Sequence, residues 1–368
     1  MRNDHPKISF MCPSYNHGKY VAAFIRSVLA QTVPDWELII VDDRSRDDNV
    51  AQIRQYQDPR IKLIVHKRNA GINETLNDAF KAASAPILSF IASDDELLPS
   101  YAETVLSAFS VHTDVGVVYT PLWRMDDNGC EVSGVSKRLI EIPPEDYFRA
   151  FFLMDNFIQS PGMAFKREFA EHIFPLSPGL FQYQDASLHM ALARYTKAHH
   201  LDSPVVRYRF SSTSASSPGK EQVTQRYGET ALYMEYAINL IGGDVELLKE
   251  KFKGDSVLNC GDILPEHIPF WMARIALTSK LPERRLWGLQ KIVSCLAHEG
   301  FVAQLYDTMK FEYCDIVAML RSCEPVMFTC GYDAPVKKTI FPGITKTKRK
   351  DSRELNVFGI KIRYKKRK

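Results

Sequence analysis

The chain has 368 residues, of which 45% are hydrophobic and 25% are charged. This mixture is typical of a globular protein and excludes a disordered, collagen-like or disulfide-stapled chain. The length is sufficient for two or three packed units. The net charge of +3 is unevenly distributed along the chain. Residues 337–368 contain 13 Lys and Arg and 2 Asp and Glu, whereas residues 1–336 contain 34 Lys and Arg and 42 Asp and Glu. An acidic body with a basic tail predicts that the tail meets an anionic partner.

The cysteines and the hydropathy pattern narrow the class of protein further. The seven cysteines are odd in number and scattered, and none forms a Cys-x-x-Cys pair, so we expect free thiols in a reducing compartment. No stretch approaches the roughly 18 apolar residues of a membrane-spanning helix. The charged residues at the start of the chain precede no apolar segment of the kind found in secretory signals. These features predict a cytoplasmic protein.

The first 120 residues alternate between strand and helix patterns. Short apolar runs predict strands, and apolar residues at helical spacing predict helices between them. The strands are expected at 8–12, 37–41, 61–65, 86–91 and 115–119. Helices are expected from about Val21, Ile72 and Tyr101 onward, and these residues belong to their apolar faces. This β-α-β-α order implies an α/β fold with a mainly parallel sheet flanked by helices.

The remainder of the chain changes character twice. Residues 121–218 are mixed: 126–129 predict a hairpin turn, 165–174 and 186–195 predict helices, and the polar run 211–219 predicts a loop or boundary. Residues 220–323 are almost wholly helical in pattern, with helices expected at 268–278, 282–297 and 301–320. We therefore predict an α/β domain over 1–218, divided near residue 120, a helical region over 219–330, and a basic tail over 331–368.

Polar residues follow three of the predicted strands. Asp42 and Asp43 come directly after one strand, and Ser93, Asp94 and Asp95 follow another. Ligands of parallel sheets bind beyond the carboxyl ends of the strands, so position alone nominates these residues. Three successive acids at 94–96 need a cation or hydrogen-bond donors, and a divalent cation bridging to a diphosphate is a suitable partner. The alternative for both acidic pairs is helix capping.

A short loop, Pro13-Ser14-Tyr15-Asn16, follows the first predicted strand. A loop at this position can place backbone amides and a side chain against a nucleotide. The alternative is a plain turn in which Ser14 or Asn16 caps the next helix.

Taken together in order, these segments resemble a known family. The loop at 13–16, ELIIVDDRS at 37–45, Asn69-Ala70-Gly71 and SFIASDDELLP at 89–99 are similar to the nucleotide-binding half of family 2 glycosyltransferases. The resemblance covers about residues 6–215 and includes 181–185 (FQYQD), which looks like the family's glutamate-aspartate segment. It implies the GT-A fold, a Rossmann-like mixed sheet, with a nucleotide-sugar-binding half at 1–120 and an acceptor-side half at 121–218.

The resemblance also implies an activity and roles for individual residues. The activity is inverting transfer of a sugar from a nucleotide sugar, with UDP expected, to a free or lipid-linked saccharide in polysaccharide, lipopolysaccharide or glycoconjugate synthesis. Asp43 would accept from the nucleobase, Asp94 would face the ribose or metal, and Asp95 would ligate Mn²⁺ or Mg²⁺. Asp185 would be the general base, and one such base suffices without a covalent intermediate. The rest of the implied donor site is Pro13, Ser14, Tyr15, Asn16, Arg68, Asn69, Gly71, Asn77 and Ser93.

The sequence departs from the family pattern at four positions. Ala92 stands where the family's metal motif has an acid, so metal binding depends on Asp94 and Asp95. Leu76 replaces an arginine, and we expect Lys67 or Arg68 to substitute for its phosphate contact. Ser211 stands where a histidine ligand is common, and Gln184 replaces the glutamate before the base.

The basic tail favours attachment to an anionic membrane surface, so that the protein would lie on the inner face of the membrane. Its alternative is a solvated end, although alternation of apolar and basic residues from Phe358 to Tyr364 is strand-like. No nucleic-acid-binding module is recognisable, so no nucleic-acid partner is expected, and homo-oligomer formation stays open. The competing functions are a nucleotidyltransferase-like enzyme and a non-catalytic glycosyltransferase-like binding subunit.

Overall fold

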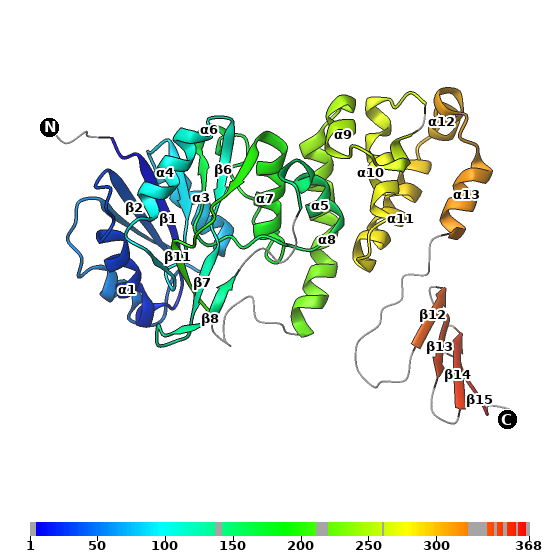
Figure 1. The fold of residues 1–368 in the computed structure, drawn as a ribbon. Coiled ribbons are helices and arrows are strands. Elements are labelled where there is room, and N and C mark those ends of the chain that lie inside the picture. Colours follow the sequence, from blue (N-terminus) through cyan, green and yellow to red (C-terminus); the bar gives the residue numbers. More distant parts are fainter. Residues whose placement is uncertain are drawn as a thin grey trace. The chain divides into compact units, whose positions relative to one another are not determined.

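The computed structural model describes residues 5–136, 142–210, 220–259 and 261–322, and four strands between residues 337 and 365 (Figure 1). Contacts between residues divide the chain into two compact units, Met1–Met272 and Ala273–Lys368, and each is considered by itself. The domain boundaries predicted at 218 and 330 stay predictions.

The first unit is built on a seven-stranded sheet in the order β10-β6-β9-β4-β1-β2-β3. Neighbouring strands run parallel, except that β9 is antiparallel to both β4 and β6. The predicted α/β fold with a mainly parallel sheet is therefore confirmed. The strands are β1 (Ile8–Ser14), β2 (Trp36–Asp42), β3 (Ile61–Val65), β4 (Ile87–Phe90), β6 (Val115–Tyr119), β9 (Met163–Lys166) and β10 (Lys197–His200).

Alternation along the strands divides the sheet into two apolar faces. Ile8, Phe10 and Cys12 of β1 belong to one core together with α1 and α4. Helix α3 packs against β1 and β2. Because helices cover the sheet, strands such as β1 and β2 are buried along their whole length. The helices of this region are α1 (Gly18–Leu29), α2 (Asn49–Ile53), α3 (Ile72–Ala82) and α4 (Tyr101–Val111).

A second sheet of four strands, in the order β5-β11-β7-β8, accompanies the central one. Its strands are β5 (Glu96–Leu97), β7 (Leu122–Met125), β8 (Glu131–Ser136) and β11 (Val206–Arg209). The hairpin turn predicted at 126–129 joins β7 to β8: Gly129 N donates to Asp126 O at 3.0 Å, and Gly129 has φ +80°. This sheet brings residues 206–209 beside residues 96–97, more than a hundred positions away.

One predicted helix is wrong. Residues 165–174 were expected to be helical, but the segment begins as β9 and only then forms the short helix α6 (Arg167–Ala170). Met163, Ala164 and Phe165 are buried and insert between β4 and β6. Pairing with strands from distant parts of the chain overrides the local helical pattern here.

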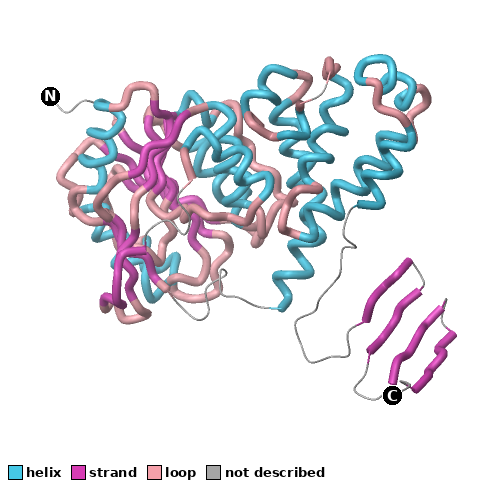
Figure 2. The backbone as a smooth tube through the Cα atoms, turned by 45° about the vertical axis from the view of Figure 1, so that its right-hand side comes forward, coloured by secondary structure: helices cyan, strands magenta, loops and turns pink. Residues whose placement is uncertain are grey.

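Helices dominate the rest of the first unit and the start of the second (cyan in Figure 2). The predicted helix at 186–195 is confirmed as α7 (Gln184–Tyr195), which packs against α5 (Tyr147–Leu153) and α8 (Lys220–Ile241). The remaining helices of the first unit are η1 (Pro144–Asp146), α9 (Val245–Lys251), η2 (Ser256–Leu258) and η3 (Pro265–His267). Helix α10 (Ile268–Ala276) spans the division between the units. The loop predicted at 211–219 lies outside the described residues.

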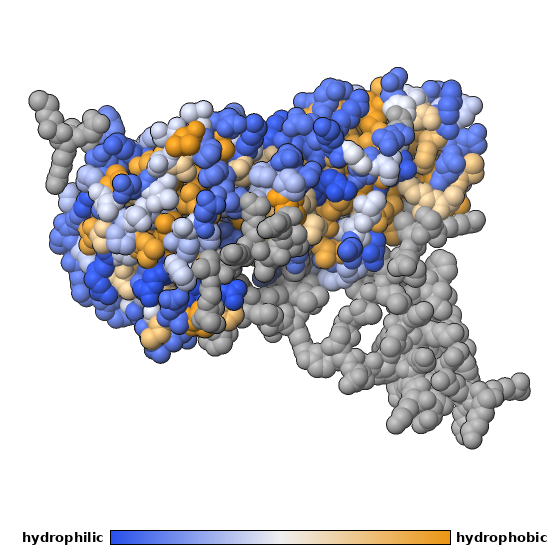
Figure 3. Space-filling view, in the orientation of Figure 1, coloured by the Kyte–Doolittle hydropathy of each residue, from blue (hydrophilic) through white to orange (hydrophobic). Residues whose placement is uncertain are grey.

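In the second unit α11 (Pro282–Leu296) agrees with prediction, but the single helix expected at 301–320 is two helices. They are α12 (Phe301–Met309) and α13 (Tyr313–Ser322), separated after Lys310, whose φ of 57° ends α12. Exposed apolar side chains such as Val293 and Tyr306 are scattered in this unit. Figure 3 likewise shows polar and apolar residues interspersed on the face in view.

The basic tail contains an antiparallel sheet with strand order β12-β13-β14-β15. The strands are β12 (Lys337–Phe341), β13 (Ile344–Lys348), β14 (Ser352–Val357) and β15 (Ile360–Lys365). The strand-like alternation recognised in the sequence therefore corresponds to β15, although Phe358 lies outside the described residues. Among the helices that the structure describes, none has the length and apolarity needed to cross a bilayer.

Candidate active site

The carboxyl ends of β1, β2 and β4 lie side by side and bring together side chains predicted for the site. Ser14 ends β1, and its Oγ accepts from Ser93 Oγ, just beyond β4, at 2.8 Å. Asn49 Nδ2 donates to Ser14 Oγ at 2.8 Å and to Asp42 Oδ2 at 2.7 Å. The buried Asp42 also accepts from Ser45 N at 2.9 Å. Ser14, Asp42 and Ser93 thus form a polar framework beneath the sheet edge.

The loop at 13–16 does not cap the next helix. Asn16 has φ 55°, a left-handed conformation that asparagine tolerates. Its backbone N donates to Ser45 Oγ at 2.9 Å, and its Oδ1 accepts from Arg46 N at 2.8 Å. These bonds fasten the loop after β1 to the loop after β2. Tyr15, at 39% exposure, is presented at the surface beside them.

Asp43 is a carboxylate whose acceptor positions are mostly occupied. Its Oδ1 accepts from Ala70 N at 2.7 Å and lies 2.8 Å from His66 Nδ1, while its Oδ2 accepts from Gly71 N at 2.8 Å. Asn69 Nδ2 donates to the Asp43 carbonyl at 3.1 Å. Because a carboxylate has about four acceptor positions, one on Oδ2 is left for a further donor. Asp43 therefore holds the 69–71 loop in addition to facing the sheet edge.

Two other residues predicted for the donor site differ in placement. Arg68 is exposed. Asn77 is buried, and its amide pairs with both backbone groups of Leu176: Nδ2 donates to the carbonyl at 3.0 Å and Oδ1 accepts from the N–H at 2.6 Å. Asn77 thus bonds α3 to the segment that follows β9, and its side chain is directed to Leu176.

The acidic loop after β4 contains a carboxylate oxygen without a partner. Asp95 is buried, and its Oδ1 accepts from Arg209 N at 2.8 Å. Its Oδ2 is also buried but has no hydrogen bond in the described part of the chain. The Asp94 carboxylate is partly exposed and lies 3.7 Å from His17 Nδ1. Burial, together with the nearby Asp94 charge, raises the pKa of Asp95 well above its ordinary value.

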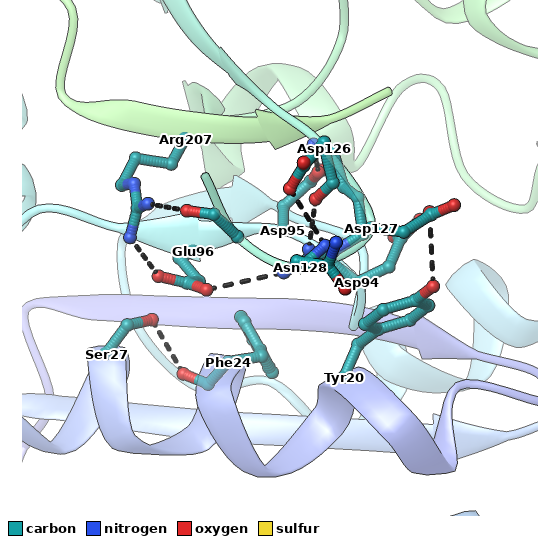
Figure 4. A network of polar contacts seen from close by, with 12 residues as sticks. Tyr20, Phe24, Ser27, Asp94, Asp95, Glu96, Asp126, Asp127, Asn128 and Arg207 are labelled. Atoms are coloured by element: carbon teal, nitrogen blue, oxygen red, sulfur yellow. Dashed lines mark hydrogen bonds and ion pairs between the residues drawn. The ribbon is translucent and has the colours of Figure 1, made fainter. Parts of the chain in front are cut away.

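Arg209, at the end of β11, holds this acidic loop and was not predicted as a site residue. Its Nε donates to Asp94 O at 2.8 Å and its Nη1 to Asp126 O at 2.6 Å. Its Nη2 lies 3.3 Å from Glu96 Oε1, and its guanidinium lies 4.4 Å from the centre of the Tyr20 ring. In Figure 4 the 126–128 turn, the acidic loop and Tyr20 of α1 converge, and Arg207 pairs with Glu96. Arg209 lies two positions before Ser211, in a segment for which the sequence indicated only a missing histidine ligand.

The acidic loop has part of what a divalent cation requires. No group of three or more His, Cys, Asp and Glu side chains that could hold a metal is found in the described ranges. Asp94 and the unpartnered Oδ2 of Asp95 offer oxygen ligands of the kind that Mn²⁺ and Mg²⁺ accept. Such a pair fits a cation whose other ligands come from a bound diphosphate and water.

Asp185 lies in a second cluster, formed by α7, the end of β6 and the loop before β9. It is partly buried in the first turn of α7. Burial raises its pKa, and the polar side chains of Ser160 and Gln184 act in the opposite direction without outweighing it. The loop that contains Ser160 is bonded to β4, because Gly162 N, two residues after Ser160, donates to Phe90 O at the end of β4 at 2.9 Å. An aspartate with a raised pKa in the first turn of a helix suits a general base.

Comparison with known proteins identifies the family. The sequence profile of glycosyl transferase family 2 matches residues 9–174. An uncharacterized glycosyltransferase of Nostoc sp. is 30% identical over 227 residues, which cover 59% of this chain and 70% of the relative. The UDP-Glc:alpha-D-GlcNAc-diphosphoundecaprenol beta-1,3-glucosyltransferase WfgD of Escherichia coli is 36% identical over 100 residues, covering 27% of this chain and 40% of WfgD.

The fold has solved counterparts as well. The crystal structure of residues 1–349 of Staphylococcus aureus TarS superposes with a TM-score of 0.52 at 17% identity, covering 78% of this chain and 88% of TarS. This likeness is one of fold, and it agrees with the mixed, mainly parallel sheet described above. Together with the profile match and the Nostoc relative, it confirms the resemblance seen in the sequence. The chain belongs to glycosyltransferase family 2.

Proposed function

We propose that the protein is an inverting, metal-dependent transferase that moves a sugar from a UDP-linked donor to a saccharide acceptor in cell-surface polysaccharide synthesis. WfgD is named for a UDP-Glc donor and for an acceptor carried on diphosphoundecaprenol. TarS has been crystallised with UDP and with UDP-GlcNAc. These names favour a UDP-linked donor and a lipid-linked acceptor for this chain.

The observation that carries the proposal is the unpartnered Oδ2 of Asp95 beside Asp94 at the end of β4. An acceptor oxygen that is buried without a partner is costly unless a ligand satisfies it. Asp94 and Asp95 would hold Mn²⁺ or Mg²⁺, and the cation, when bound, offsets charge on the leaving diphosphate. Pro13, Ser14, Tyr15, Asn16, Asp43, Arg68, Asn69, Gly71 and Ser93 complete the proposed donor site, with Asn77 acting through Leu176.

Asp185 is the proposed base. One of its carboxylate oxygens takes the proton of the acceptor hydroxyl as that oxygen bonds to the anomeric carbon. The bond from that carbon to the diphosphate breaks in the same step, so the nucleoside diphosphate leaves and the configuration inverts. The charge of Asp185 must be present for this step, and its raised pKa keeps the proton affinity high.

The direct test is a panel of nucleotide sugars with Mn²⁺ and a saccharide acceptor, scored for release of nucleoside diphosphate. Asp185→Asn is expected to lower transfer by at least about 10²-fold. The matched control is Asp114→Asn, which changes an aspartate paired with Lys197 at 2.8 Å on the surface and should leave transfer unchanged. Wild-type rates in Asp185→Asn would refute the base assignment.

The same assay separates the competing functions. A nucleotidyltransferase would release pyrophosphate rather than a nucleoside diphosphate. A non-catalytic binding subunit would be thermally stabilised by a nucleotide sugar without consuming it. Either result would overturn the proposed transfer reaction.

We also propose that the basic tail holds the protein on the inner face of a membrane, where a lipid-linked acceptor would be available. Each basic residue near an anionic leaflet contributes on the order of 1 kcal/mol. Co-sedimentation of the full chain with vesicles containing phosphatidylglycerol tests this, with Lys361, Arg363 and Lys365 of β15 changed to Gln for comparison. Equal binding of both proteins would remove these three side chains of β15 from the attachment.

A further inference from the structure

A histidine outside the predicted donor site lies beside Asp43. His66 directly follows β3, and its backbone N donates to the Asp42 carbonyl at the end of β2 at 2.9 Å. Its side chain is 11% exposed, and its Nδ1 lies 2.8 Å from Asp43 Oδ1. Because an ionised carboxylate only accepts hydrogen bonds, Nδ1 carries the hydrogen and donates it to Asp43. His66 thus occupies one acceptor position of a carboxylate in the proposed donor site.

The two oxygens of Asp43 differ in how many of their acceptor positions are filled. Ala70 N donates to Oδ1 at 2.7 Å, so this oxygen receives two bonds, one from Ala70 and one from His66. Gly71 N donates to Oδ2 at 2.8 Å and is the single partner of that oxygen in the described ranges. Since each oxygen has about two acceptor positions, Oδ1 is full and Oδ2 can take one more donor.

The backbone around Asp43 fixes which oxygen stays open. Asp43 N donates to the Ser14 carbonyl at 2.9 Å, and Asn69 Nδ2 donates to the Asp43 carbonyl at 3.1 Å. The N–H groups of Ala70 and Gly71 are consecutive, and Gly71 has φ +88°. The carboxylate therefore cannot present Oδ1 to a ligand without breaking two hydrogen bonds.

Nucleobases differ in the number of adjacent donors that they offer to a carboxylate. Uracil offers one, the imide N–H between its two carbonyl groups. Guanine offers two, the ring N1–H and the neighbouring amino group, and the two oxygens of a free carboxylate can accept both at once. Asp43 has an open position on one oxygen only, so it can pair fully with the uracil imide but leaves one guanine donor unpaired. A donor that loses its water without gaining a partner lowers affinity.

We propose that His66 is a specificity-determining residue, which restricts Asp43 to one nucleobase donor and thereby favours a UDP-linked sugar over a GDP-linked one. This inference rests on the proposed function, in which Asp43 belongs to the donor site. His66 acts through Asp43 and not on the nucleotide, so it is a positioning residue.

The second nitrogen of His66 has a separate partner, which makes a control possible. Nε2 lies 3.2 Å from Asp78 Oδ2 on α3. Asp78 is 36% exposed and also pairs with Lys81 at 2.9 Å. Solvent screens a pair of this kind, so its contribution is small. Asp78→Asn therefore changes the far side of the ring and leaves the bond from Nδ1 to Asp43 in place.

The test compares the dissociation constants of UDP and GDP, each with Mn²⁺, by isothermal titration calorimetry of the full chain. Wild type should prefer UDP by about tenfold or more, the size of one hydrogen-bonded base contact. His66→Leu opens a position on Asp43 Oδ1, so the ratio of the two constants should fall several-fold towards unity. His66→Asn, whose amide nitrogen can take the place of Nδ1, should keep the wild-type ratio, as should the control Asp78→Asn.

The ratio separates specificity from a structural role. If His66 only stabilises the fold, His66→Leu weakens both nucleotides equally, and an unchanged ratio would overturn the inference. A wild-type protein that binds GDP as tightly as UDP, or binds neither, would instead contradict the UDP-linked donor of the proposed function. Circular dichroism verifies the fold of each variant. Should His66→Leu be unfolded, His66→Gln replaces it, because its amide nitrogen reaches the position of Nε2 and not that of Nδ1, and the same fall in the ratio is expected.

Discussion

The acids at the end of β2 and the acids after β4 occupy similar places but have opposite surroundings. Asp43 accepts from the backbone N–H groups of Ala70 and Gly71, and Asp42 accepts from the backbone N–H of Ser45 and the side-chain amide of Asn49. Asp95 receives one backbone N–H and keeps one oxygen unpartnered within the described residues. Hydrogen bonds stabilise the first pair, whereas Asp95 is buried beside the charge of Asp94, and both effects raise the pKa of Asp95.

The comparison gives a criterion for distinguishing carboxylates that stabilise the fold from carboxylates that can bind a ligand at the same sheet edge. A fully bonded carboxylate adds to stability and fixes a loop, since hydrogen bonds favour its charged form. A buried carboxylate with unused acceptor capacity costs stability and is retained for a ligand. By this criterion Asp42 and most of Asp43 are scaffold, and Asp95 is the carboxylate with capacity left for a ligand.

The largest expected effect is in Asp95→Asn. Without this ligand we expect transfer to fall by roughly 10³-fold, while the free energy of unfolding does not fall, because a buried charge beside Asp94 is removed. The measurements are nucleoside diphosphate release and chemical unfolding, with Mn²⁺-dependent thermal stabilisation as a third readout. A large decrease in the free energy of unfolding would mean that Asp95 stabilises the fold as Asp42 and Asp43 do, and would contradict the difference proposed between the two pairs.

Arg209→Met should have the next largest effect. It leaves the Asp94 and Asp126 carbonyls and Glu96 without their buried donor, which should cost about 3 kcal/mol of stability, and loosening of the acidic loop should reduce transfer about 10²-fold. Arg207→Met is the control, since Arg207 pairs with the same Glu96 at 2.6 Å but is 33% exposed and should cost at most about 1 kcal/mol. Equal losses in the two variants would contradict a special role for Arg209.

Asp43→Ala tests whether Asp43 mainly stabilises the 69–71 loop. Loss of the charge-assisted bonds to Ala70 and Gly71 should cost about 2–3 kcal/mol, and the freed 69–71 loop should raise the KM for the donor several-fold with little change in kcat. Asp78→Ala, which removes the other partner of His66 at 3.2 Å, should alter neither quantity appreciably. A change in kcat alone would mean that Asp43 acts in the chemical step.

The smallest effect concerns Glu37, at the opposite end of β2. Burial would raise its pKa, but bonds from Lys62, Ser9 and Ser84 outweigh burial and lower it. A lowered folded-state pKa adds stability above the ordinary pKa of 4.5, and this stability is lost as the pH falls below that value. Glu37→Gln should therefore be less stable than wild type by about 1–2 kcal/mol at pH 7, with the difference shrinking towards pH 3 in urea unfolding. A difference independent of pH would contradict this account.

The sequence was sufficient to predict the strand ends and the acids that follow them. Asp42, Asp43, Asp94 and Asp95 follow apolar runs whose pattern is local, and parallel pairing brings such ends together. The hairpin turn at 126–129 and helix α7 were likewise recognisable from short-range signals. The family resemblance then supplied Asp185, which no local pattern distinguishes from other acids at helix starts.

What could not be predicted depends on distant pairing. Residues 165–174 have a helical pattern, and insertion of β9 between β4 and β6 makes the first of them part of a strand. Arg209 reaches Asp94 across 115 positions, and His189 meets Tyr119 across 70. Contacts of this kind are set by the register of the second sheet and by helix packing, which leave no trace in the spacing of nearby residues.

The distance along the chain between Asp95 and its donor has a consequence for synthesis. Arg209 N lies 114 positions after the carboxylate that it bonds. A ribosome adding about 5–20 residues per second supplies Arg209 on the order of ten seconds after Asp95. During that interval the strands β1 to β4 are already available to pair, but the acidic loop has no guanidinium to hold it. The bond between Asp95 and Arg209 N can therefore form only after β11 has been synthesised.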